Sequence, residues 1–329
     1  MTTLVRVEAG PDAGQPWHFG DPYREQRTYL AGQGAVDLSH RGVVRVDGAD
    51  RLTWLHSLTT QSLDTLQPYV STETLVLSPH GHVEHALHVV DDGDTTWLTV
   101  EPGTAPALAQ WLDSMRFMLR VEVSDVSADW AVVGEPTRTP GGGDVLAWVD
   151  PWPTISPGSV AYGLVDGHAG AAWTHRELIV PRPELSDRLT AVEPVGLWAF
   201  EALRVEAARP RLGFETDHRT IPHEVDWLRT AVHLDKGCYR GQETVARVHN
   251  LGRPPRRLVL LHLDGSDAAL PEAGASVQLD GKDIGRVTTP ARHHELGPVA
   301  LAVVKRNIPV AAQVEVEGIA AAQQVVVLP

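Results

Sequence analysis

Apolar residues along the first hundred positions gather in short runs that are separated by turn signals. The runs are rich in valine, leucine and threonine, as strands usually are, and Asp47-Gly48 and Asp91-Asp92-Gly93-Asp94 between them are typical of turns. We therefore expect strands at residues 43–46, 72–77, 83–90 and 95–100.

Apolar residues recur at helical spacing in three other places. Asp50 can cap a helix that carries Leu52, Leu55 and Leu58, and Thr104 with Pro106 opens a second helix. A third is expected from about Pro194 to Ala208, because Pro210 cannot continue it. Residues 1–30 and 134–159 show no sustained period, and we interpret them as an extended lead-in and an irregular connection.

The last part of the chain changes character after the run Arg253-Pro254-Pro255-Arg256-Arg257. Short strands separated by glycine turns are expected there, at residues 258–263, 277–279, 284–288, 299–304, 314–316 and 325–328. Such a series is typical of a small β-barrel. The pattern predicts an α+β protein with a lead-in at 1–30, a main region at 31–255 and a barrel at 256–329.

Composition narrows the class of protein. The 329 residues are 43% hydrophobic and 21% charged, which is ordinary for a globular chain, and no run is long enough to span a membrane. A net charge of −14 disfavours direct binding to nucleic acid. One cysteine excludes an intramolecular disulfide and agrees with a reducing compartment, so we expect a cytoplasmic protein without a membrane partner.

That cysteine, Cys238, lies between two glycines and two cations. Gly237 and Gly241 allow a sharp turn, and Lys236 and Arg240 can lower the pKa of the thiol and make it reactive. A lone cysteine is more often a small buried apolar residue. The polar surroundings favour the exposed, reactive alternative here.

The segment Lys236–Glu243, KGCYRGQE, followed by Thr244-Val245-Ala246-Arg247, resembles the signature of the folate-binding YgfZ family, relatives of the glycine-cleavage T-protein. The resemblance continues at residues 37–42, 203–207 and 284–288. It implies a ring of three subdomains around a central folate site, two of them interleaved within residues 31–255, followed by the barrel.

The resemblance also implies tetrahydrofolate or a related reduced folate as cofactor, with Glu206 holding the pterin. The residues that it places at the site are Arg204, Glu206, Tyr239, Gln242, Glu243, Arg247 and His85. Arg240, Arg247 and Arg253 could meet the anionic tail, and Trp198 or Trp227 could stack on a ring. The alternative is that Glu206 lies on a helix surface and pairs with Arg204 or Arg209.

The sequence departs from the T-protein enzymes at one functional position. Those enzymes carry an aspartate in a segment that resembles G-G-V-I-D-D-L, whereas Gly81–Leu87 places His85 and Ala86 at the two aspartates. His85 could accept a proton near neutral pH. The nearby His80, His82 and His88 do not form a tetrahedral set with it, so no metal site is expected, and one thiolate cannot hold an iron–sulfur cluster alone.

Three hypotheses follow. The first is a folate-binding protein that supports assembly or repair of iron–sulfur proteins, with those proteins or assembly factors as partners, Cys238 reactive, and Lys236 and Arg240 assisting it. The second is a tetrahydrofolate-dependent aminomethyltransferase or other one-carbon transferase, which the loss of the aspartate at His85 disfavours. The third is a structural or partner-binding module in which the motif shapes a turn.

Overall fold

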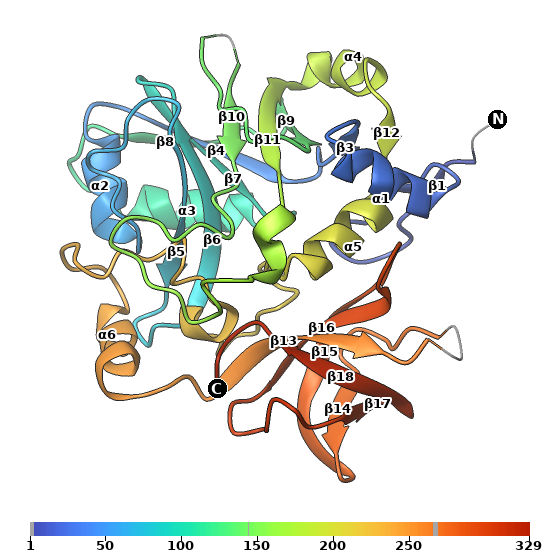
Figure 1. Cartoon of the computed structure of the whole chain (residues 1–329). Coiled ribbons are helices and arrows are strands. Elements are labelled where there is room, and N and C mark those ends of the chain that lie inside the picture. The colour runs from blue at the N-terminus through green and yellow to red at the C-terminus, as the bar shows by residue number, and fades with distance from the viewer. Residues whose placement is uncertain (1–2, 144, 266–268) are drawn as a thin grey trace.

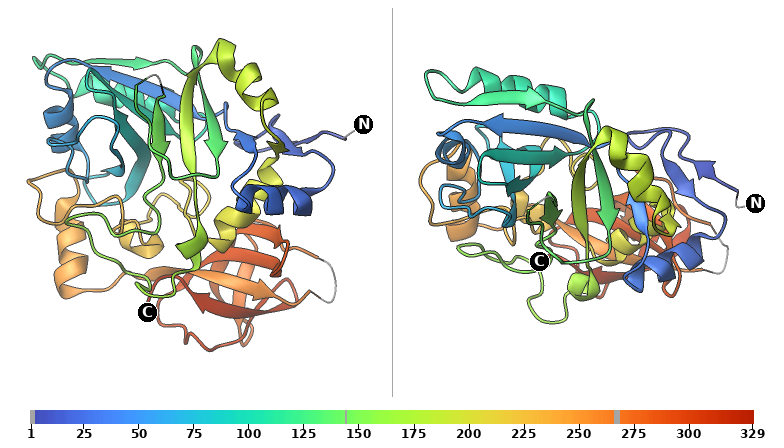
Figure 2. Two further views of the ribbon diagram at one scale, coloured as in Figure 1. Left: turned by 45° about the horizontal axis from the view of Figure 1, so that its top comes forward. Right: turned by 90° about the horizontal axis from the view of Figure 1, so that it is seen from above.

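The computed structural model describes residues 3–143, 145–265 and 269–329, which form three main β-sheets and several short helices (Figure 1). The barrel drawn in orange and red lies below the other two sheets, and α5 (Leu197–Glu206) lies between it and the second sheet, as the further views show (Figure 2). No helix in these ranges combines the length and the apolar character that crossing a bilayer requires.

The first sheet has five antiparallel strands in the order β5 (Ser71–Leu77), β6 (Val83–Asp91), β7 (Thr95–Val100), β4 (Gly42–Asp47) and β8 (Glu122–Asp125). Two helices, α2 (Arg51–Leu58) and α3 (Ala105–Ser114), cover one face with Leu55, Leu108 and Leu112. The four strands and two helices predicted in this region are confirmed.

The second sheet has the order β10 (Ala147–Val149), β11 (Arg176–Pro181), β9 (Trp130–Glu135), β3 (Ala35–Asp37) and β12 (Pro194–Val195), with only β12 and β3 parallel. Helix α5 packs under it with Leu197, Phe200 and Leu203. The predicted third helix is confirmed but starts at Leu197, because Pro194 and Val195 pair with β3 instead.

A closed six-stranded barrel ends the chain, in the order β13 (Arg256–Leu263), β16 (Gly297–Lys305), β15 (Lys282–His293), β14 (Ser276–Leu279), β17 (Val314–Val316) and β18 (Ile319–Val325). Val259 and Leu261 fill its interior, whereas Leu258 and Leu260 face outward against the cluster that includes α5. Both faces of β13 are therefore buried, which explains its continuous apolar run.

Three expectations need correction. Residues 3–30 are not only extended, because they form the hairpin β1 (Val5–Arg6) and β2 (Pro16–His18) and the helix α1 (Pro22–Leu30), which packs on α5. The irregular connection at 134–159 contains β10. The last strand lies at residues 319–325 rather than 325–328. The remaining helical elements are η1 (Ala169–Ala172), η2 (Arg182–Glu184), α4 (Leu185–Thr190), η3 (Pro222–Val225) and α6 (Gln242–Leu251).

Candidate functional site

The turn that carries Cys238 precedes α6, and its cysteine is exposed. Gly241 has a backbone φ of +81°, and a Cβ atom at this position would lie 2.5 Å from the carbonyl oxygen of Ser78. Gly81 has a φ of +79°, and its Cβ would lie 2.6 Å from the Cβ of Thr244. The two glycines therefore interlock the Cys238 turn with the hairpin between β5 and β6, since only glycine fits both close approaches.

Gly237 differs from Gly241, although the sequence suggested equal roles for them. Its φ lies outside the left-handed region, and no atom lies within 4 Å of the place where its Cβ would be. The sharp turn after Cys238 therefore rests on Gly241 alone.

Lys236, which is predicted to activate the thiol, is engaged with main-chain carbonyls in this structure. Its ammonium donates hydrogen bonds to the carbonyl oxygens of His56, Thr59 (2.6 Å) and Gln61 (3.0 Å), at the end of α2 and in the loop after it. Burial lowers the pKa of Lys236 to about 8. The side chain thus fastens the start of the Cys238 turn to α2, and its charge is directed at main-chain carbonyls.

The two residues after Cys238 connect the turn to the first sheet. The Arg240 guanidinium donates to Glu84 of β6 at 2.8 Å and lies over the ring of Trp111 of α3 at 5.9 Å. Tyr239 is buried in the main core cluster, and burial raises the pKa of its hydroxyl. Tyr239 is thus a core residue, and its predicted place at a ligand site stays a prediction.

The basic stretch around the motif is mostly engaged within the protein. Arg256 pairs with Asp217 and Glu224, and Arg257 is fully buried at the barrel, where it donates to the Ile308 carbonyl at 3.0 Å. Arg253 donates to the carbonyl of Pro329. In the first turns of α6, Gln242 is half-buried and Glu243 and Arg247 are exposed.

His85 lies on β6, on the face that α2 and α3 cover. It shares this face with Leu87, whereas Ala86 packs against the cluster that contains Tyr239 and Val245. Burial lowers the pKa of His85, and its Nδ1 atom has no hydrogen-bond partner among the described residues. The ring is therefore disposed to be neutral at physiological pH.

Glu206 ends α5 and faces the barrel. Its carboxylate is 3.0 Å from Nε2 of His293, and its side chain remains 36% exposed. It also lines a small hollow of about 20 Å³ together with Tyr29, Trp173 and Leu203. The carboxylate of Glu206 is thus partly exposed beside two largely buried aromatic side chains.

Arg204 does not share that hollow, although it lies one turn or less from Glu206. It is 1% exposed, and its guanidinium donates to Glu201 at 2.8 Å and to Glu215 at 3.0 Å. Arg204 is thus engaged within the protein, and its predicted contact with a ligand stays a prediction. The two tryptophans predicted to stack on a ligand ring pack within the protein. Trp198 stacks on Trp17 with 5.7 Å between the ring centres, and Trp227 is buried in the core.

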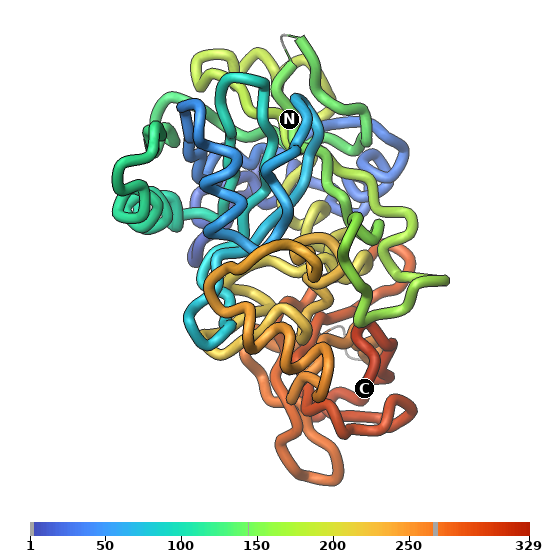
Figure 3. The backbone as a smooth tube through the Cα atoms, turned by 90° about the vertical axis from the view of Figure 1, so that its left-hand side faces the viewer, coloured from blue at the N-terminus to red at the C-terminus, as the bar shows by residue number. Residues whose placement is uncertain are grey.

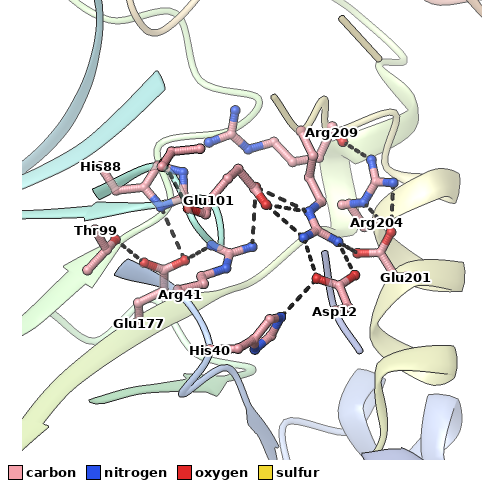
Figure 4. A network of polar contacts seen from close by, with 12 residues as sticks. Asp12, His40, Arg41, His88, Thr99, Glu101, Glu177, Glu201, Arg204 and Arg209 are labelled. Atoms are coloured by element: carbon pink, nitrogen blue, oxygen red, sulfur yellow. Dashed lines mark hydrogen bonds and ion pairs between the residues drawn. The ribbon is translucent and has the colours of Figure 1, made fainter. Parts of the chain in front are cut away.

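The feature that the sequence did not reveal is a buried network of charged side chains between the first sheet, α5 and the N-terminal hairpin (Figure 4). Arg211 lies at its centre. Its guanidinium nitrogens are 2.7 Å from a carboxylate oxygen of Glu101 and 2.9 Å from those of Asp12 and Glu201. The network also includes His40, Arg41, His88, Thr99, Glu177, Arg204 and Glu215.

Hydrogen bonds and ion pairs keep two acids of this network, Asp12 and Glu101, ionised. Burial opposes the charge of Asp12, but bonds from His40 and Arg211 hold the pKa of Asp12 far below its usual value. Burial likewise opposes the charge of Glu101, and the neighbouring Arg211 and Arg41 lower its pKa. The centre is therefore a charge-paired core in this structure.

The structure thus brings together some predicted residues and separates others. Lys236, Cys238 and Arg240 form one turn, and Arg240 reaches the strand that carries His85. Glu206 contacts the barrel and lines a small hollow with residues of α1, η1 and α5. Among the described ranges, no group of three or more His, Cys, Asp or Glu side chains is placed to bind a metal ion.

Comparison with known proteins gives consistent likenesses. Residues 256–329 match the family of the glycine cleavage T-protein C-terminal barrel domain. The chain is 28% identical over 320 residues to an aminomethyltransferase of Nostoc sp., covering 89% of this chain and 82% of that protein. It is 26% identical over 280 residues to a chloroplastic protein of Arabidopsis thaliana that is provisionally named a transferase, covering 77% of this chain but only 61% of that protein.

The structural likeness extends over the whole chain. The crystal structure of the glycine cleavage system aminomethyltransferase T from Bartonella henselae superimposes with a TM-score of 0.78 at 19% identity, covering 100% of this chain and 93% of that one. The protein therefore has an aminomethyltransferase-like α+β fold with a C-terminal barrel domain, as the sequence predicted.

Proposed function

We propose that this protein, a YgfZ-like member of its fold group, binds tetrahydrofolate or a related reduced folate and supports the assembly or repair of iron–sulfur proteins in the cytoplasm. The observation that carries the proposal is the single cysteine, exposed on a turn that Gly241 fixes to the β5–β6 hairpin and Lys236 fixes to α2. A thiol held in this way can act as a transient ligand to a cluster on a partner protein. The similarity to aminomethyltransferases supports a folate as ligand.

Glu206 is our candidate for the pterin-binding acid, because the sequence resemblance gives it that role and its carboxylate is partly exposed beside Tyr29 and Trp173. We expect calorimetric titration with tetrahydrofolate to show binding by the wild type and at least about tenfold weaker binding by Glu206→Gln, since a charge-assisted hydrogen bond is lost. Glu122→Gln, at an exposed position of β8, is the matched control. The folate proposal fails if the wild type does not bind.

Cys238 is our candidate for the iron–sulfur role. We expect Cys238→Ser to fold normally, because the cysteine is exposed, and to lower the activity of iron–sulfur enzymes to the level of cells that lack the protein. Thermal unfolding checks the first statement and enzyme activity in the complemented cells checks the second. If Cys238→Ser restores those activities as well as the wild type does, the motif serves only to shape the turn.

A one-carbon transferase is the second candidate, and the comparisons with aminomethyltransferases favour it. His85, however, occupies the position at which those enzymes carry an aspartate, and it faces α2 and α3. Transfer of a one-carbon unit from an amine donor to tetrahydrofolate, lost in His85→Ala, would establish this second function.

A further inference from the structure

One buried arginine differs from the others in its partners. Six arginine side chains are buried in the part of the chain that the structure describes. Five of them form an ion pair with at least one carboxylate, namely Arg41, Arg204, Arg209, Arg211 and Arg229. The sixth, Arg257 at the start of β13, is 0% exposed and has no carboxylate partner among the described residues. A guanidinium stays protonated in proteins, so this charge cannot be removed by loss of a proton.

Arg257 lies inside one end of the barrel, which forms the lower part of the molecule in Figure 3. Alternation along β13 places its side chain on the same side as Val259 and Leu261, which fill the barrel interior. Its partner across the sheet is Val304 of β16, and Ile308 in the segment after β16 is buried in the same apolar cluster. The charge of Arg257 therefore has mostly apolar surroundings.

Only one nitrogen of the Arg257 guanidinium has hydrogen-bond partners among the described residues. Its Nη2 atom donates to the Ile308 carbonyl at 3.0 Å and to Oε1 of Gln323 at 3.1 Å. The amide nitrogen of Gln323 donates to the carbonyls of Ala312 at 2.8 Å and Pro309 at 3.2 Å, which fixes the direction of Oε1. The Nε and Nη1 atoms are buried and have no partner in the described ranges. Two neutral oxygens thus contact a charged group whose other donors are free.

The electrostatic surroundings of Arg257 do not compensate its charge. Burial lowers the pKa of Arg257, and no acid among the described residues raises it. Burial acts in the same direction on Arg204 and Arg211, but neighbouring acids raise their pKa values above the usual one. Lys305, at the end of β16, adds a further cation near this end of the barrel and donates to the main-chain carbonyl of Asp283 at 3.0 Å. A buried charge without an ion partner is strongly unfavourable.

We infer that this end of the barrel binds a monatomic anion, such as chloride, beside the Nε or Nη1 atom of Arg257. A water molecule could accept hydrogen bonds from these atoms, but it would not neutralise the charge. A larger anion such as phosphate is a poorer occupant, because both nitrogens are enclosed. A monatomic ion needs about the space of the internal water molecules that folded proteins commonly hold. The inference goes beyond the proposed function and does not depend on it.

Thermal unfolding in sodium chloride and in sodium gluconate of equal ionic strength tests the site, because gluconate is too large to enter it. We expect saturating chloride to raise the unfolding midpoint of the wild type by about 2 °C relative to gluconate. Arg257→Met should fold, since methionine suits the apolar surroundings, and should lose this difference. Arg257→Gln is a second variant without the charge, in case the methionine variant does not fold. Arg253→Met, at an exposed position four residues earlier, is the matched control and should keep the difference.

Diffraction from wild-type crystals grown in sodium bromide locates the ion directly, because bromide scatters anomalously. We expect an anomalous peak beside the Nε or Nη1 atom of Arg257. Bromide found only at surface positions, with ordered water beside Arg257, overturns the inference. An equal chloride effect in the wild type and in a folded variant without the charge also overturns it. A peak beside Arg257 without any chloride effect on unfolding means an adventitious ion only, which contradicts the inference as well.

Discussion

Arg211→Met should lower the free energy of unfolding by about 3–5 kcal/mol, because it leaves three buried carboxylates without their shared partner. The Arg211 guanidinium donates to Asp12, Glu101 and Glu201, and it is 4% exposed. It also lies 4.0 Å from the centre of the Phe214 ring, a contact that methionine can partly replace. Urea denaturation followed by circular dichroism measures the change.

The pH dependence gives this prediction a second readout. Asp12 and Glu101 have lowered pKa values in the folded protein, so their stabilising contribution is complete above the unfolded pKa of about 4 and is lost as the pH falls through the folded values. In Arg211→Met the pKa of Glu101 loses the largest cause of its depression and that of Asp12 loses part of it, since His40 still donates to Asp12. The difference in stability between wild type and variant should therefore shrink as the pH falls from about 5 toward 3.

An exposed ion pair provides the control. Arg24 and Glu193 pair at 2.7 Å with 66% and 51% of their side chains exposed, and Arg24→Met should cost at most about 1 kcal/mol. Equal losses in the two variants would contradict the view that the central network holds the N-terminal hairpin, the first sheet and α5 together.

The elements that sequence reasoning located correctly are those whose pattern is local. Residues 95–100 combine three threonines with Trp97, Leu98 and Val100, which are mostly residue types that favour strands, and they form β7 with the predicted bounds. The strand at 319–325 was missed because Ile319-Ala320-Ala321-Ala322-Gln323-Gln324 carries almost no β-branched residue. Its position depends on pairing with β13 and β17, which no local pattern records.

The candidate site divides in the same way. The exposure of Cys238 could be predicted, because glycines and cations next to a thiol are visible in the sequence. The hydrogen-bond partners of Lys236 could not be predicted, since the carbonyl of His56 lies 180 residues earlier in the chain. The same holds for Asp12, which reaches Arg211 across 199 residues from a segment that shows no periodic pattern at all. Contacts of this kind arise from topology and not from spacing.

Gly241→Ala should destabilise the protein by about 2–5 kcal/mol and displace the Cys238 turn. A left-handed backbone costs about 1–2 kcal/mol for alanine, and the added methyl group would lie 2.5 Å from the Ser78 carbonyl oxygen and 2.9 Å from the Cα of Gly81. The hairpin and the turn must then separate. Thermal unfolding measures the stability, and the rate of Cys238 alkylation by iodoacetamide measures the change at the turn.

Gly237→Ala is the matched control within the same motif. Its Cβ would meet no atom within 4 Å, and its backbone lies outside the left-handed region, so alanine should cost nothing or stabilise slightly by restricting the unfolded chain. If both variants lose stability equally, the motif glycines are needed for flexibility in general. If only Gly241→Ala loses stability and alters the alkylation rate, the close contact between Gly241 and Gly81 fixes the position of the thiol. The β5–β6 hairpin then explains why a glycine is needed at position 241.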